Sequence, residues 1–134
     1  GALKWLQVDG IVGTALGQWQ SWTPTLTGWS STSLLGARYI KIGKFVAGVI
    51  MIDGTSNDSV AKASLPVTAA ANGLQFRGAW GFGRDNGGQL SSPGAWIVGS
   101  GSTDVGFYKT MLDGAAWTAS GNKTVYATFQ YEAA

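Results

Sequence analysis

The sequence has no cysteine and no histidine, and it is poor in proline and in charged residues. The first two absences exclude thiol nucleophiles, histidine-based catalytic triads, iron–sulfur clusters and the common zinc sites. Charged residues make up 12% of the 134 residues and give a net charge of +2, whereas about 25% is usual. The surface must therefore be built largely from small polar residues and exposed aromatic rings.

Long apolar runs and clusters of basic residues are also missing. The longest apolar stretch, residues 45–52, is far shorter than the ~20 residues that a membrane-spanning helix needs. The densest basic group, Arg38, Lys41 and Lys44, is too sparse to follow a phosphate backbone. We therefore expect neither membrane insertion nor nucleic-acid binding. The first residues lack the pattern of a signal peptide, and we expect the chain to be a fragment of a longer protein.

Glycine and tryptophan are abundant, at 21 and seven residues, and the apolar pattern has the two-residue period of β-strands. Residues 38–42 alternate polar with apolar, residues 45–52 resemble a buried strand, and Gly43-Lys44 between them fits a two-residue hairpin turn. Many short strands with glycine-rich turns predict an all-β sandwich or barrel. The other predicted strands are residues 64–67 (an edge strand, because of Pro66), 74–80, 95–98, 105–108 and 125–131.

Polar turns are predicted between these strands. Residues 53–58 form a turn cluster, residues 83–94 form a long polar loop, and Asn122-Lys123 turns the chain into the last strand.

Two parts of the chain differ in character. In residues 1–20, apolar residues are interrupted by glycines, which predicts a short strand at 4–8 and a glycine-broken connector. We interpret residues 1–20 as a neck that associates with other copies, and residues 21–134 as a globular head. Tryptophan is enriched at subunit interfaces. The expected packing or interchain anchors are Trp5, Leu6, Val8, Ile11, Trp19 and Trp22.

Four segments, in this order, resemble a known family. They are residues 22–28 (WTPTLTG), 37–46 (ARYIKIGKFV), 64–67 (SLPV) and 123–133 (KTVYATFQYEA). Together they are similar to the C-terminal head domains of tail fibres and minor tail proteins of tailed bacteriophages. The chain departs from that pattern between the first two segments, where residues 29–36 replace a longer polar insertion. This departure implies a smaller binding surface.

The resemblance implies a jelly-roll-like β-sandwich that forms a homotrimer at the distal end of a phage tail fibre. Such a head is extracellular, part of the virion, and attached to an upstream fibre shaft. Its partner would be a receptor on the bacterial host, often a surface polysaccharide. Because binding residues in this family lie in variable loops, the resemblance assigns no site residue.

Candidate binding residues follow instead from the chemistry of sugars. Aromatic rings stack on the apolar face of a sugar, while amides and carboxylates bind its hydroxyl groups. It is more common for a tryptophan to pack in a core or subunit interface, and a polar loop can equally be a solvated connection. The candidates are the loop-associated tryptophans and the polar loop between two of them: Trp29, Trp80, Trp96, Trp117, Arg84, Asp85, Asn86 and Gln89.

Catalysis, a metal and a cofactor are not expected. Nearly all of the carboxylates lie beside glycine or serine in apparent turns, where Asx hydrogen bonding explains them. No acid–base pair can be named for a polysaccharide depolymerase. Residues 53–58 lack the ligand order of an EF-hand, so a plain turn is favoured over a calcium loop. The sequence is also compatible with a fibre head that only trimerises or caps, and with a monomeric carbohydrate-binding module of a cellular protein.

Overall fold

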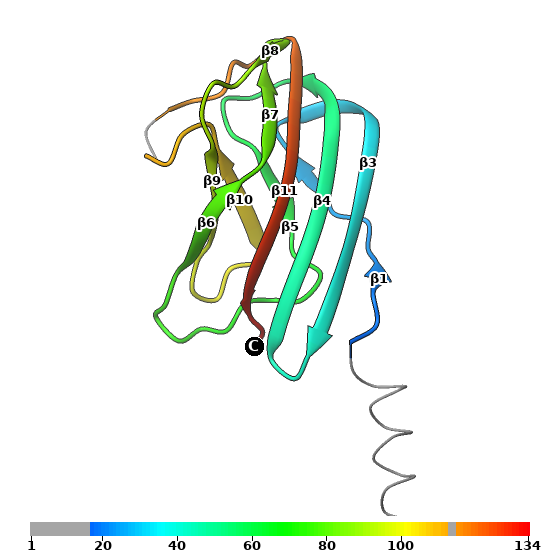
Figure 1. The fold of residues 1–134 in the computed structure, drawn as a ribbon, viewed down its shortest axis with the longest axis vertical. Helices are drawn as coiled ribbons and strands as arrows, with labels where there is room; N and C mark the ends of the chain where they lie inside the picture. Colours follow the sequence, from blue (N-terminus) through cyan, green and yellow to red (C-terminus); the bar gives the residue numbers. More distant parts are fainter. Residues whose placement is uncertain (1–16, 113–114) are drawn as a thin grey trace, which may run out of the picture.

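The computed structural model describes residues 17–112 and 115–134, which form two antiparallel sheets arranged as a β-sandwich without a helix (Figure 1). This confirms the all-β prediction. In spatial order, the six-stranded sheet contains β1 (Gln20–Ser21), β3 (Trp29–Ile42), β4 (Phe45–Ser56), β11 (Asn122–Glu132), β7 (Phe82–Asp85) and β8 (Gly88–Gln89). The five-stranded sheet contains β2 (Leu26–Thr27), β5 (Lys62–Ser64), β10 (Asp104–Tyr108), β9 (Gly94–Val98) and β6 (Phe76–Trp80).

The three long strands β3, β4 and β11 run along the length of the molecule and define its two ends (Figure 1). The first described residues, the β3–β4 turn and the C-terminus lie at what we call the lower end. The β7–β8 turn and the start of β11 lie at the opposite, upper end. The chain therefore arrives at one end and presents a group of connections at the other.

The β3–β4 hairpin follows the predicted turn. Ile42 pairs with Phe45, and Gly43 has φ = 58°, which glycine adopts without the penalty that a Cβ brings. The strand after the turn is longer than predicted, because it stays paired with β11 as far as Thr55, opposite Asn122. The turn predicted at residues 53–58 is therefore wrong for residues 53–56, which belong to β4.

Three other predicted boundaries are corrected. The edge strand at residues 64–67 is wrong, because β5 ends at Ser64 and lies between β2 and β10. Asn122 and Lys123 belong to β11, and the turn residue before them is Gly121, with φ = 77°. The polar loop at residues 83–94 contains the β7–β8 hairpin. Its two turn residues, Asn86 and Gly87, have φ = 51° and 79°, as a type I′ turn requires.

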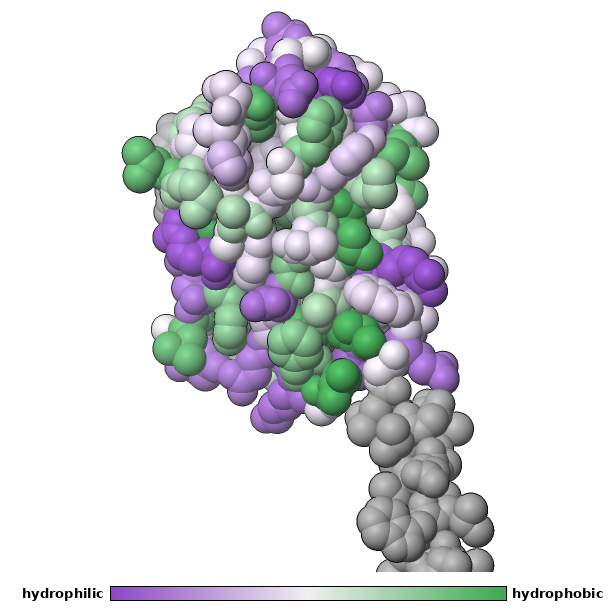
Figure 2. Space-filling model, viewed as in Figure 1, coloured by the Kyte–Doolittle hydropathy of each residue, from purple (hydrophilic) through white to green (hydrophobic). Residues whose placement is uncertain are grey.

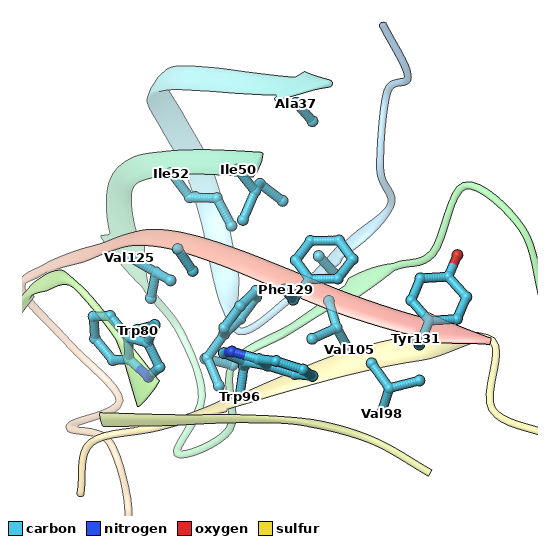
Figure 3. Close-up of a cluster of buried hydrophobic side chains, with 14 of the residues drawn as sticks. Ala37, Ile50, Ile52, Trp80, Trp96, Val98, Val105, Val125, Phe129 and Tyr131 are labelled. Carbon is cyan, nitrogen blue, oxygen red and sulfur yellow. The ribbon is translucent and has the colours of Figure 1, made fainter. Parts of the chain in front are cut away.

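The core explains why glycine and tryptophan are both abundant. An aromatic ring faces a glycine directly across the ladder in three pairs, Trp80–Gly94, Trp96–Gly78 and Phe129–Gly48. At each of these glycines, a Cβ would collide with the paired ring. Large rings thus fill the space that the missing side chains leave between the sheets, which gives a closely packed core (Figure 3).

The predicted neck lies mostly outside the described residues, and so do the strand at residues 4–8 and the candidates Trp5, Leu6, Val8 and Ile11. Of the described neck residues, Gln20 pairs with Tyr39 as part of β1. Trp22 is half-buried against Tyr39 and Phe129, and its indole N–H donates to the carbonyl of Ser64 at 3.1 Å. Trp19, in contrast, is 49% exposed.

Candidate binding site at the upper end

The four tryptophans predicted to contact a ligand are all buried. Trp29, Trp80, Trp96 and Trp117 are between 3% and 7% exposed. Trp29, Trp80 and Trp117 also donate their indole N–H groups to backbone carbonyls, at 2.9–3.0 Å. The prediction that these rings form a sugar-stacking surface is therefore wrong. The hydrophobic area of all four rings is used in the core, where Trp80 and Trp96 fill the space beside glycines.

Asp85, the acidic residue of the predicted loop, is bound internally. Its carboxylate accepts hydrogen bonds from Lys109 Nζ at 2.9 Å, from the backbone N–H of Thr118 at 2.9 Å and from the Thr118 hydroxyl at 3.0 Å. Burial raises the pKa of Asp85, but these hydrogen bonds outweigh it and hold the pKa below its usual value. Asp85 therefore ties the β7–β8 hairpin to the segment around Thr118 instead of pointing toward a ligand.

The remaining loop candidates are accessible at the upper end. Asn86 and Gln89 are exposed, and Arg84 is half-buried, with its guanidinium carbon 4.9 Å from the centre of the Phe82 ring. Asn86 also lies against Gly121, where a Cβ would collide with the Asn86 amide oxygen. The hairpin turn is thus packed beside the start of β11.

A hollow of about 400 Å³ opens next to this turn and was not predicted. Its lining is rich in hydroxyl groups and comprises Ser31, Thr32, Ser33, Gly54, Thr55, Gly121 and Asn122. β3 carries two irregularities here, between Trp29 and Ser31 and between Thr32 and Leu34. Such bulges are common beside binding sites. The only sequence signal for this part of the site was the Ser-Ser-Thr-Ser run at residues 30–33.

Gly54 makes the bulged segment possible. A Cβ at this position would collide with the backbone carbonyl oxygen of Ser31. The close approach of β3 to β4 therefore requires a residue without a side chain at position 54. This close approach brings hydroxyl groups from both strands to the rim of one hollow.

Asp53 holds together the strands beside the hollow. Its carboxylate accepts hydrogen bonds from the Asn122 amide at 2.6 Å, from the Thr124 hydroxyl at 2.7 Å and from the Ser33 hydroxyl at 3.3 Å. The bonds from Asn122 and Thr124 are the main reason that the pKa of Asp53 lies below its usual value. Asp53 stays ionised at neutral pH and orients the side chains around it.

A fully buried ammonium group lies in the core near the upper end. Lys123 donates from Nζ to the carbonyls of Gly28, Asp58 and Val60, at 2.9, 3.0 and 2.9 Å. The same nitrogen lies 5.0 Å from the centre of the Trp29 ring and 5.5 Å from that of Trp117. The ammonium group thus joins the start of β3 to the segment after β4, while the two rings supply cation–π attraction.

Lys123 is expected to make the stability of the fold depend on pH. Burial lowers its pKa to about 8, against 10.5 for an unperturbed lysine, so the unfolded chain holds the extra proton between these values. The free energy of unfolding should therefore rise with pH from about pH 8 to 10, by at most ~1.4 kcal/mol per unit. Above pH 10 the free energy of unfolding should instead fall as the pH rises. Burial raises the pKa of Tyr131 to about 12, so the unfolded chain loses this proton at a lower pH than the folded one.

Urea titrations at several pH values between 7 and 10 measure this effect. The Lys123→Met variant lacks the titrating group and serves as the control, so its stability should not rise over the same range. If the free energy of unfolding of the variant rises with pH as steeply as that of the wild type, other groups cause the pH dependence.

These contacts define a β-sandwich domain with a polar, hydroxyl-lined hollow at one end. The described residues hold no cluster of three acidic residues that could bind a metal ion, and they include no helix long and apolar enough to cross a membrane. Comparison of the sequence with protein-family models gives no match, and neither does comparison with curated proteins. The arrangement suits recognition of a neutral polyhydroxylated molecule through hydrogen bonds.

Proposed function

We propose that the chain is the head of a bacteriophage tail fibre and binds a glycan on the surface of the bacterial host. In this proposal the head is a jelly-roll-like homotrimer on the virion, attached to an upstream shaft. The observation that carries the glycan-binding role is the hydroxyl- and amide-lined hollow at the end opposite the first described residues. Figure 2 supports it, because hydrophilic side chains gather at that upper end.

The position of the hollow suits adhesion. A fibre attached at the lower end would hold the upper end outward, so that Asn86, Thr55 and the serines of β3 meet the host surface first. The binding would rely on hydrogen bonds to sugar hydroxyls. Because the four candidate tryptophans are buried in the core, ring stacking contributes nothing to the argument.

The decisive experiment combines two conservative changes, one in the lining of the hollow and one in the β7–β8 turn beside it. Thr55→Val removes a hydroxyl group and keeps the β-branched shape, while Asn86→Gly removes the amide and keeps a residue that accepts positive φ. A lost hydrogen bond is worth about 0.5–1.5 kcal/mol. The double variant should therefore bind host cells or purified envelope polysaccharide about tenfold more weakly, as measured by pull-down over a host panel.

The matched control is Thr68→Val, which removes the same hydroxyl at the lower end, where the Thr68 carbonyl accepts the backbone N–H of the C-terminal Ala134. It should bind like the wild type. Equal binding by the double variant and the control would refute the site. Failure of the wild-type chain to bind any cells or polysaccharide would favour the second candidate, a head that only trimerises or caps the fibre. The exposed apolar side chains of β3 and β4 are the observation that favours that candidate.

A further inference from the structure

One strand of the six-stranded sheet is apolar on both faces, but the described residues cover only one of them. The inward residues of β4 include Val46, Ile50 and Ile52, all completely buried. Its outward residues between Phe45 and Met51 are also apolar without exception, yet Phe45 is 49% exposed and Met51 is 40% exposed. Strands that are apolar on both sides are ordinarily covered on both sides. Within residues 17–112 and 115–134, the outer side of β4 therefore lacks the partner that its sequence indicates.

The neighbouring strand and the start of the chain extend this apolar surface. Ile40 and Ile42 of β3 lie opposite Ala47 and Phe45 in the ladder, on the same side of the sheet. Trp19 lines a groove of about 440 Å³ together with Ala47 and Val49, and the groove continues over β11 and β6, where Thr128, Gln130 and Arg77 line it. We call this surface the apolar outer face; it comprises Trp19, Ile40, Ile42, Phe45, Ala47, Val49 and Met51. Figure 2 shows hydrophobic side chains in the same region, toward the lower end.

The apolar character is most continuous on the β3–β4 side of the sheet. On β11, the outward residues opposite Phe45, Ala47 and Val49 are polar, namely Glu132, Gln130 and Thr128. Opposite Met51, Tyr126 packs against Phe82 of β7. Within the apolar outer face the ladder contributes a single charged residue, Arg38, whose guanidinium donates to the Trp19 carbonyl at 3.4 Å. Depletion of charge at the centre of an apolar patch is typical of the core of a protein–protein interface.

The position of the preceding chain identifies the occupant. Trp19 belongs to the apolar outer face, and the described chain begins only two residues earlier, at Gly17. Residues 1–16 are rich in large apolar side chains, and any association between copies through that segment would bring their apolar outer faces within reach of one another. Such tethering raises the effective concentration of one face for the next. We propose that the apolar outer face is the surface on which copies of this chain pack against each other.

This inference rests on the proposed function in one respect only, which is that the number of copies is three. The experiment places charges on the face at two side chains that are already partly in solvent, in the double variant Phe45→Glu/Met51→Glu. The whole chain should have a mass near three chains by light scattering, and the double variant should fall to the mass of one. Its circular dichroism should retain the β-sheet signal of the wild type.

Leu74→Glu is the matched control, because Leu74 is also an exposed apolar residue, at 59%, but lies outside the apolar outer face. It should keep the wild-type mass. If the double variant does not fold, Ile42→Lys, at a side chain that is 44% exposed beside the hairpin turn, tests the same surface. A wild-type chain that is monomeric at all concentrations, or folded face variants that keep the wild-type mass, would overturn the proposal.

Glycan binding is measured separately on the same proteins. A single-chain face variant should still bind the glycan that the wild type binds, but with weaker retention, because three linked sites have become one. If the Thr55→Val/Asn86→Gly protein loses glycan binding but keeps the wild-type mass, the result bears on the upper hollow and not on the apolar outer face. The failure of one proposal can thus be distinguished from the failure of the other.

Discussion

Replacing Lys123 with methionine is expected to destabilise the fold by about 3 kcal/mol at pH 7, because one buried group serves three segments. Methionine matches the length of the aliphatic chain but donates no hydrogen bond, so the carbonyls of Gly28, Asp58 and Val60 lose their shared donor. Leaving a buried polar group without its hydrogen-bond partner typically costs about 1–3 kcal/mol. The lowered pKa of Lys123 reduces the expected loss, because the wild-type ammonium is itself costly to bury.

Urea denaturation of the whole chain measures the change as a shift of the midpoint. Lys62→Met is the control, since Lys62 is exposed on β5 and such surface changes usually stay within about 0.5 kcal/mol. A Lys123→Met protein as stable as this control would show that the ammonium group contributes nothing net. Methionine would then replace the three hydrogen bonds by hydrophobic packing between Trp29 and Trp117.

Replacing Gly94 with alanine is expected to cost about 3 kcal/mol, although it adds only one methyl group. The new Cβ would collide with the carbonyl oxygen of Tyr108 and with the indole of Trp80. That indole N–H donates to the same carbonyl at 2.9 Å. Neither atom can retreat easily, because the first is backbone next to β9 and the second belongs to a buried ring that stacks on Trp117. Overpacking of this kind destabilises cores by about 1–3 kcal/mol, and more where backbone must move.

The matched control is Gly99→Ala, at a position where a Cβ would meet nothing within 4 Å. It should be neutral, or stabilising by up to ~1 kcal/mol through the unfolded state. Thermal unfolding of the two variants beside the wild type provides the comparison. Equal melting temperatures for Gly94→Ala and Gly99→Ala would contradict the close packing of Trp80 against β9.

The periodicity of the sequence predicted two kinds of strand. In one kind, polar and apolar residues alternate between the two faces, and in the other a short apolar run is bounded by turn residues. The β3–β4 hairpin turn, β9, β10 and most of β11 follow from such patterns. The first half of β3 does not, because residues 30–36 are exposed small or polar residues and leucines without alternation. Pairing with β4 makes this segment a strand, and that is a tertiary effect which a local pattern does not contain.

The candidate site was predicted in part. Residues 84–89 were expected to reach the surface, and the structure places Asn86 and Gln89 there, at the upper end. The tryptophans were assigned wrongly because composition does not tell whether a ring faces solvent or a glycine on the next strand. The hydroxyl-lined hollow combines β3, β4 and the start of β11, so it could be recognised only once those segments were placed side by side.

The long strands have a mechanical consequence for the proposed role, in which the protein would adhere at one end and be held at the other. A pull between the upper hollow and the start of β1 acts roughly along β3, β4 and β11 (Figure 1). The β4–β11 ladder joins every residue from Asn122 to Glu132 to a partner, so a pull along the strands that separates β4 from β11 would load its hydrogen bonds in parallel. Bonds loaded in shear must break together, whereas a perpendicular pull would open them one at a time. The architecture is therefore suited to slow unfolding under tension, the quantity that governs the lifetime of a stretched tether.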